Sequence, residues 1–141
     1  MKHVLIAADH GGFPLKEQLT EDLRQRGYQV TDYGTANHDS VDYPDFADRV
    51  CRDISPNTCG ILICGTGIGM SMAANRHRHV RAALCTSVRM ALLSRQHNDA
   101  NVLCLGARTT QPSTALEIVL AWLDTEFSGE PRHRQRIKKF S

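Results

Sequence analysis

A short apolar run that leads into three alternating glycines places the strongest constraint on how this chain can fold. Residues 60–64 (Gly-Ile-Leu-Ile-Cys) are typical of a strand buried on both faces of a sheet. Gly65, Gly67 and Gly69 follow at once, before a segment with helical character. Glycine permits a sharp turn and leaves backbone N–H groups uncovered. The pattern therefore predicts a strand, a tight turn and a helix, with Cys64 at the carboxyl end of the strand beside several amide donors.

The rest of the chain repeats this alternation of apolar runs and helix-like segments. Strands are expected at residues 3–8, 28–34, 60–64, 80–85 and 100–105. Helices are expected at residues 13–26, 45–53, 67–76, 87–96 and 112–127, and the basic tail, 129–141, is a candidate for a last helix. Such alternation predicts a Rossmann-like α/β fold, a doubly wound, five-stranded parallel sheet with helices on both faces. At 141 residues we expect a single domain, 1–141.

Composition excludes several classes of protein. No apolar run approaches the roughly 18 residues needed to cross a bilayer, and the N-terminal residues lack the apolar core of a signal peptide. We therefore expect a cytoplasmic protein with no membrane partner. The five cysteines include no Cys-x-x-Cys pair, which argues against a disulfide framework or a structural zinc site. A formal charge of +2 does not indicate a nucleic-acid-binding protein, although residues 130–141 are strongly basic.

The glycine stretch fails three known signatures. A Walker loop requires a lysine where Thr66 stands. Position 70 must be glycine in a dinucleotide-binding fingerprint and arginine in a phosphotyrosine-phosphatase-like loop, but it is Met70. What remains is a thiol beside a nest of amides, which would stabilise a thiolate and also an oxyanion on a substrate. This pair suits proton abstraction next to a carbonyl; the alternative is that Cys64 is a small buried residue at a strand end.

Further polar residues could complete a site. Asp9-His10-Gly11-Gly12 ends the first strand, on the same sheet edge as the cysteine, where it could bind a sugar or phosphate or merely cap a helix. His97 precedes the fifth strand, so ordinary topology puts it at the opposite edge, and a neighbouring subunit or an unusual connection would have to bring it to the same site. His77-Arg78-His79 is expected to be a solvated turn, not a metal site. Arg132 and Arg136 share a helix face and suit a phosphate monoester, unless the tail is simply solvated.

Together these motifs resemble ribose-5-phosphate isomerase type B, within the sugar-phosphate isomerase family that includes the galactose-6-phosphate isomerase subunits. The resemblance covers nearly the whole chain and rests on residues 9–13, 42–44, 60–69 and 94–101 and on the two tail arginines. It implies interconversion of an aldose phosphate and its ketose through an enediolate, with ribose 5-phosphate and ribulose 5-phosphate of the pentose phosphate pathway as the expected pair. Galactose 6-phosphate, allose 6-phosphate or a tetrose phosphate are alternative substrates, and a non-catalytic sugar-phosphate-binding domain is an alternative function.

The resemblance also implies roles for individual residues. Cys64 is expected to be the base that moves the proton between C2 and C1, with Thr66 beside it, and His97 the acid that opens the furanose ring. The expected substrate contacts are Asp9, His10, Tyr43, Gly65, Gly67, Ile68, Gly69, Asn98, Arg108, Arg132 and Arg136, of which His10 and the tail arginines bind the phosphate. Family members need no metal or other cofactor, and they form homodimers or homotetramers with the site near the subunit interface. Some relatives replace the cysteine by serine and use a nearby glutamate; residues 68–71 contain no acid, so this chain is expected to be of the cysteine type.

Overall fold

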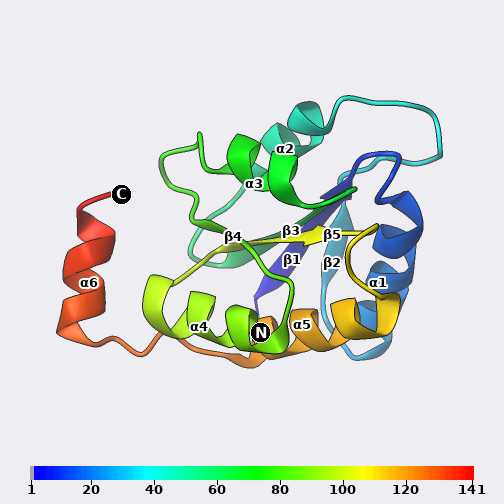
Figure 1. Cartoon of the computed structure of the whole chain (residues 1–141). Coiled ribbons are helices and arrows are strands. Elements are labelled where there is room, and N and C mark those ends of the chain that lie inside the picture. The colour runs from blue at the N-terminus through cyan, green and yellow to red at the C-terminus, as the bar shows by residue number, and fades with distance from the viewer. Residues whose placement is uncertain (1) are drawn as a thin grey trace.

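Parallel strands alternate with helices along the whole chain in the computed structural model, which describes residues 2–141 (Figure 1). The strands are β1 (His3–Ala8), β2 (Val30–Asp32), β3 (Thr58–Cys64), β4 (Ala82–Leu84) and β5 (Val102–Gly106). The helices are α1 (Phe13–Gln25), α2 (Tyr43–Cys51), α3 (Ile68–Ala74), α4 (Val88–Asn98), α5 (Pro112–Asp124) and α6 (Pro131–Lys138). The strands form one sheet in the order β2-β1-β3-β5-β4, with every pair parallel. The predicted fold class is confirmed.

The predicted elements differ from the observed ones mainly at their ends. β2 and β4 each span three residues, fewer than the sequence predicted. Both are edge strands, so each can pair on one side only, and the ladder of hydrogen bonds is short. α5 ends at Asp124, before the predicted residue 127, because Thr125 is extended and its carbonyl accepts a hydrogen bond from Arg95 at 3.0 Å.

The sheet is covered on both faces because side chains alternate along its central strands. On β1, Val4 and Ile6 pack with α1 and α5, and with Ala91 of α4, whereas Leu5 and Ala7 pack with α2 and α3. Figure 1 shows these two helical layers on opposite sides of the strands. Cys64 belongs to the cluster beneath α2 and α3, so its side chain points to that face at the end of β3. Within residues 2–141, no helix has the length and apolar character to span a bilayer.

The strand order brings β5 next to β3, although β4 lies between them in the chain. Cys64 pairs in register with Gly106, and the loop after β5 continues the contact. The Ala107 N–H donates to the Cys64 carbonyl at 2.9 Å, and the Arg108 N–H donates to the Gly65 carbonyl at 2.9 Å. This loop therefore borders the glycine turn. By contrast, α6 stands beyond the end of α4, apart from the sheet (Figure 1).

Candidate active site

The thiol of Cys64 lies against the backbone of the glycine turn. Its side chain is buried, with the residue 5% exposed, and the Gly67 N–H donates to Sγ at 3.1 Å. Gly67 adopts a left-handed conformation, with φ of 79°, and a Cβ there would lie 2.5 Å from Cδ1 of Leu84. Only glycine fits that conformation in that space. The turn thus directs the N–H of Gly67, the residue that caps the start of α3, at the sulfur.

Like Cys64, the other four cysteines are free and buried. Burial raises the pKa of Cys51 to about 12 and that of Cys59 to about 11. Burial also raises the pKa of Cys85 and of Cys104. These four side chains are therefore protonated thiols near neutral pH and pack as small apolar groups.

The loop after β1 lies beside the glycine turn, as its position in the sequence predicted. The Asp9 N–H donates to the Ile63 carbonyl at 3.1 Å, which joins the loop to the end of β3. Oδ1 of Asp9 accepts a hydrogen bond from the Gly12 N–H at 3.0 Å, so the carboxylate also holds the turn before α1. Nδ1 of His10 accepts the Val41 N–H at 3.2 Å. An atom that accepts carries no proton, so the proton of the neutral ring is on Nε2.

Arg108 and Tyr43 reach the same edge by packing over glycines. A Cβ added to Gly65 would lie 3.2 Å from Nη1 of Arg108, so the guanidinium crosses that residue. A Cβ added to Gly69 would lie 2.5 Å from Cζ of Tyr43, so the phenol ring lies against the start of α3. A single chain therefore brings together a thiol, amides, a carboxylate, an imidazole, a phenol and a guanidinium. Thr66 belongs to the same turn, and its Oγ1 accepts the Ile68 N–H at 3.2 Å.

His97 and Asn98 lie elsewhere, in the last turn of α4. The chain passes from α4 directly into β5, whose first residue, Val102, pairs with Gly60 near the start of β3. The end of α4 is thus at the amino edge of the sheet, whereas Cys64 is at the carboxyl edge. Arg132 and Arg136 are exposed on α6, beside α4. The structure does not bring these four residues to the Cys64 edge within one chain, as the topology argument predicted for His97.

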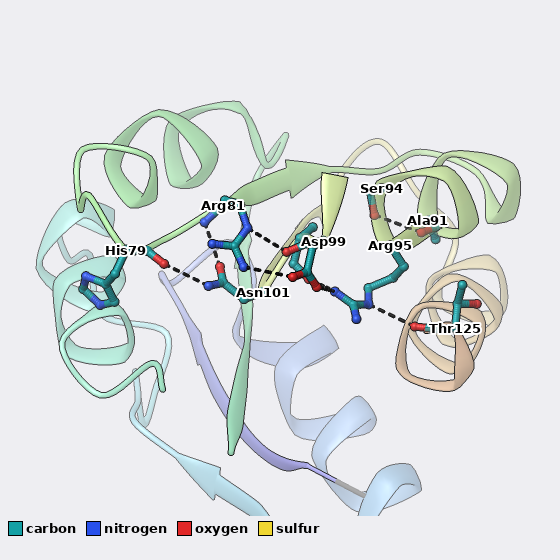
Figure 2. Close-up of polar contacts among 9 residues, drawn as sticks. His79, Arg81, Ala91, Ser94, Arg95, Asp99, Asn101 and Thr125 are labelled. Carbon is teal, nitrogen blue, oxygen red and sulfur yellow. Dashed lines mark hydrogen bonds and ion pairs between the residues drawn. The ribbon is translucent and has the colours of Figure 1, made fainter. Parts of the chain in front are cut away.

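A network of charged side chains, which the sequence analysis did not identify, fixes the turn that follows His97 (Figure 2). Asp99 ends α4 in a left-handed conformation with φ of 48°. Its Oδ1 accepts from Nη1 of Arg95 at 3.0 Å, and its carbonyl accepts from Nε of Arg81 at 2.8 Å. Arg95 also donates to the carbonyls of Thr125 and Ala100. The end of α4 is therefore tied to α5 and to the start of β5.

The imidazole of His97 stacks on that of His133 in α6. The ring centroids are 4.4 Å apart and the rings are inclined by 18°. In the 77–79 turn, which was expected to be solvated, His77 bonds Asp48 at 2.8 Å and His79 bonds the Cys51 carbonyl at 2.7 Å. Across residues 2–141, no three or more His, Cys, Asp or Glu side chains are grouped so as to hold a metal ion.

Comparison with known proteins assigns the family. Residues 4–140 match the family described as ribose/galactose isomerase. The chain belongs to this family. It is 43% identical over 140 residues to ribose-5-phosphate isomerase B of Escherichia coli, covering 98% of this chain and 93% of that protein. The structure of ribose 5-phosphate isomerase B from Anaplasma phagocytophilum superposes with a TM-score of 0.95 at 48% identity, covering 100% of this chain and 97% of that one.

A third relative has a ligand. Ribose-5-phosphate isomerase B from Mycoplasma genitalium, solved with bound ribulose-5-phosphate, superposes with a TM-score of 0.90 at 44% identity, covering 97% of this chain and 92% of that one. The resemblance stated from the sequence is thus confirmed. The chain is a sugar-phosphate isomerase of the aldose–ketose class.

Proposed function

We propose that this chain interconverts D-ribose 5-phosphate and D-ribulose 5-phosphate through an enediolate, in the cytoplasm. The observation that carries the proposal is the hydrogen bond from the Gly67 N–H to Sγ of Cys64, 3.1 Å long. It supports a role for Cys64 as a base, because it holds the sulfur at the carboxyl edge of a parallel sheet, where open α/β folds bind ligands. The relatives named for this sugar phosphate span nearly the whole chain. Five unpaired cysteines suit a reducing compartment.

In the proposed reaction, the Cys64 thiolate removes the proton from C2 of the open-chain aldose. The electron pair of the broken C–H bond forms a C1–C2 double bond, and the carbonyl oxygen on C1 becomes the enediolate oxygen. The proton of the C2 hydroxyl passes to the C1 oxygen, the C2 oxygen becomes the ketone, and the same thiol returns its proton to C1, so protons balance and no redox partner is consumed. Backbone amides of residues 65–69 hold the negative oxygen, with Thr66 beside them. Asp9, Tyr43 and Arg108 bind the sugar hydroxyls.

Ring opening and phosphate binding require groups that one chain holds at the opposite edge. We therefore propose that a second copy supplies them, with His97 as the ring-opening acid, Asn98 on the sugar, and Arg132 and Arg136 joining His10 on the phosphate. A dimer that shares its sites in this way has two equivalent sites by symmetry. Without the second copy, the sulfur would have no ring-opening acid.

Surface features support pairing of two copies. On α3, beside the glycine turn, Ile68 is 47% exposed and Met72 is 68% exposed. A groove of about 620 Å³ runs between the edge strand β4, Asn98 and the exposed ring of Phe140. Ile68 and Met72 are four residues apart and so share one face of α3, and apolar side chains that cluster on a surface are typical of protein–protein contacts. We propose that the groove and α6 of one copy receive the α3 region of the other.

A second candidate is a different phosphorylated sugar, since the family's description also names galactose. A sugar whose carbon chain is longer or shorter than that of ribose would need a different distance between the thiol and the phosphate-binding residues. The two candidates share the same chemistry at Cys64.

The test is turnover of Cys64→Ala on ribose 5-phosphate, galactose 6-phosphate, allose 6-phosphate and erythrose 4-phosphate. We expect wild type to turn over ribose 5-phosphate with the highest kcat/KM, and Cys64→Ala to lose about 10²–10⁴ in kcat. Cys85→Ala removes another buried thiol and is the matched control, which should retain kcat. A kcat of Cys64→Ala equal to that of wild type would refute the mechanism. A higher kcat/KM of wild type for a hexose phosphate would favour the second candidate.

A further inference from the structure

His133 is the contact through which α6 is held against α4. Within α6, whose residues are all described, it is the one buried side chain, with the residue 6% exposed. It buries its ring face to face on the imidazole of His97. Just before α6, the Ser128 N–H donates to the Gln96 carbonyl at 3.2 Å, which ties the entry of the helix to α4. The position of α6 therefore depends on the end of α4.

The polar atoms of His133 do not explain its position. Among residues 2–141, its buried Nε2 has no hydrogen-bond partner, and the nearest carboxylate oxygen, Oε2 of Glu130, is 3.7 Å away. That carboxylate instead accepts from Nε of Arg132 at 2.8 Å. What His133 provides is a flat ring surface, which restricts the plane that the neighbouring ring can adopt.

The same ring stands between two functional groups of the proposed site. Arg132 precedes it directly and Arg136 follows one turn later on the same helix, so any movement of α6 against α4 moves both arginines together with His133. His97 stacks on the His133 ring. The stack thus sets the separation between the ring-opening acid and the phosphate-binding arginines, and these must match the two ends of one substrate.

We propose that His133 is a positioning residue, which by stacking fixes the plane of the His97 imidazole and its distance from the arginines of α6. This inference rests on the proposed function for its effect on turnover, but the stack itself is independent of the reaction. Burial, together with the charges of His97, Arg132 and Arg136, lowers the pKa of His133. His133 therefore presents an uncharged ring face at neutral pH, which is suited to a partner that gains and loses a proton.

Three variants test the role of the ring. His133→Ala removes the ring, His133→Phe keeps a flat ring without nitrogens, and Gln135→Ala alters an exposed position on the same helix as the control. For His133→Ala we expect kcat on ribose 5-phosphate to fall about 10- to 100-fold, the loss typical of a displaced catalytic group, and KM to rise. His133→Phe should restore both to near wild type, and Gln135→Ala should change neither. Unchanged kcat in His133→Ala, or equal damage in His133→Phe, would overturn the proposal.

A second measurement separates this inference from the proposed function. In NMR spectra of histidine-labelled protein without substrate, the ring protons of His97 should be shifted upfield by the ring current of His133. The shift should vanish in His133→Ala and persist in His133→Phe. If Cys64→Ala were fully active the proposed chemistry would fail, yet these spectra would still decide whether the stack exists. A shift that is the same in His133→Ala as in wild type would refute the stack itself.

Discussion

Two inactive variants of this chain should restore one another's activity if each site takes residues from two copies. Cys64→Ala lacks the proposed base, and His97→Ala lacks the proposed ring-opening acid. Cys64 is at the carboxyl edge of the sheet and His97 at the amino edge of the same chain. In a mixed dimer, one site therefore receives both natural residues, and the other receives neither.

The expected magnitude follows from this geometry. If equal amounts of the two variants pair at random, about half of the dimers are mixed, and each mixed dimer has one intact site out of two. The mixture should therefore recover about one quarter of the wild-type activity per chain. A tetramer built from two such dimers gives the same fraction.

The assay is isomerisation of ribose 5-phosphate after the two tagged variants are denatured together and refolded, with native mass spectrometry to confirm the mixed dimers. Cys64→Ala mixed with Arg108→Ala is the matched control, since the Arg108 guanidinium lies over Gly65 of its own chain. No site in that mixture is intact, so its activity should equal the mean of the two pure variants. If mixed dimers of Cys64→Ala and His97→Ala also showed only the mean activity of the two pure variants, the shared site would be refuted.

Two further predictions concern α6. Arg132→Ala combined with Arg136→Ala should raise KM for ribose 5-phosphate by about 100-fold or more, because each of the two charged hydrogen bonds contributes about 1.5–3 kcal/mol, and leave kcat less affected; an unchanged KM in steady-state assays would mean that the tail is simply solvated. His133, which faces His97, Glu130, Arg132 and Arg136, has a pKa below its ordinary value of 6.5. The docked helix therefore binds fewer protons than the undocked one, so the contribution of neutral His133 to docking is fully present above pH 6.5 and is lost as the pH falls from there through the lowered pKa. Amide hydrogen exchange of α6, corrected for the intrinsic pH dependence, should show less protection at about pH 5 than at about pH 7.5 in wild type; equal pH sensitivity in His133→Phe would contradict the assignment to His133.

Much of the fold follows from local sequence pattern. β1 and β3 are recognisable because each is a continuous apolar run, which central parallel strands require. The carboxyl ends of parallel strands share one edge, so the sequence also predicted that Asp9 would lie beside Cys64. The same argument placed His97 at the other edge. Strand order was not predicted, because the spacing of apolar residues indicates which side chains are buried but not which strands are neighbours.

Polar contacts between distant segments could not be predicted from pattern. Lys16 occupies what would be read as a polar position of α1, yet its side chain is fully buried and its Nζ contacts Asp32 at 2.5 Å. The hydrogen bond from Arg95 to the Thr125 carbonyl, and the stack of His133 on His97, likewise depend on how helices are placed in space. A histidine in a basic tail gives no sign that it is buried.

The position of β5 between β3 and β4 affects the order in which the protein can assemble during synthesis. When the ribosome has made β1 to β4, one side of β3 has no partner. β4 cannot yet join the sheet, because its one neighbour in the sheet is β5. Residues 102–108 supply the missing strand and the two amides that bond the carbonyls of Cys64 and Gly65. The sheet edge that carries Cys64 is therefore completed only when about three quarters of the chain has been made. Until then the exposed edge of β3 is open to pairing with other chains, which makes a chain truncated before residue 102 prone to aggregation.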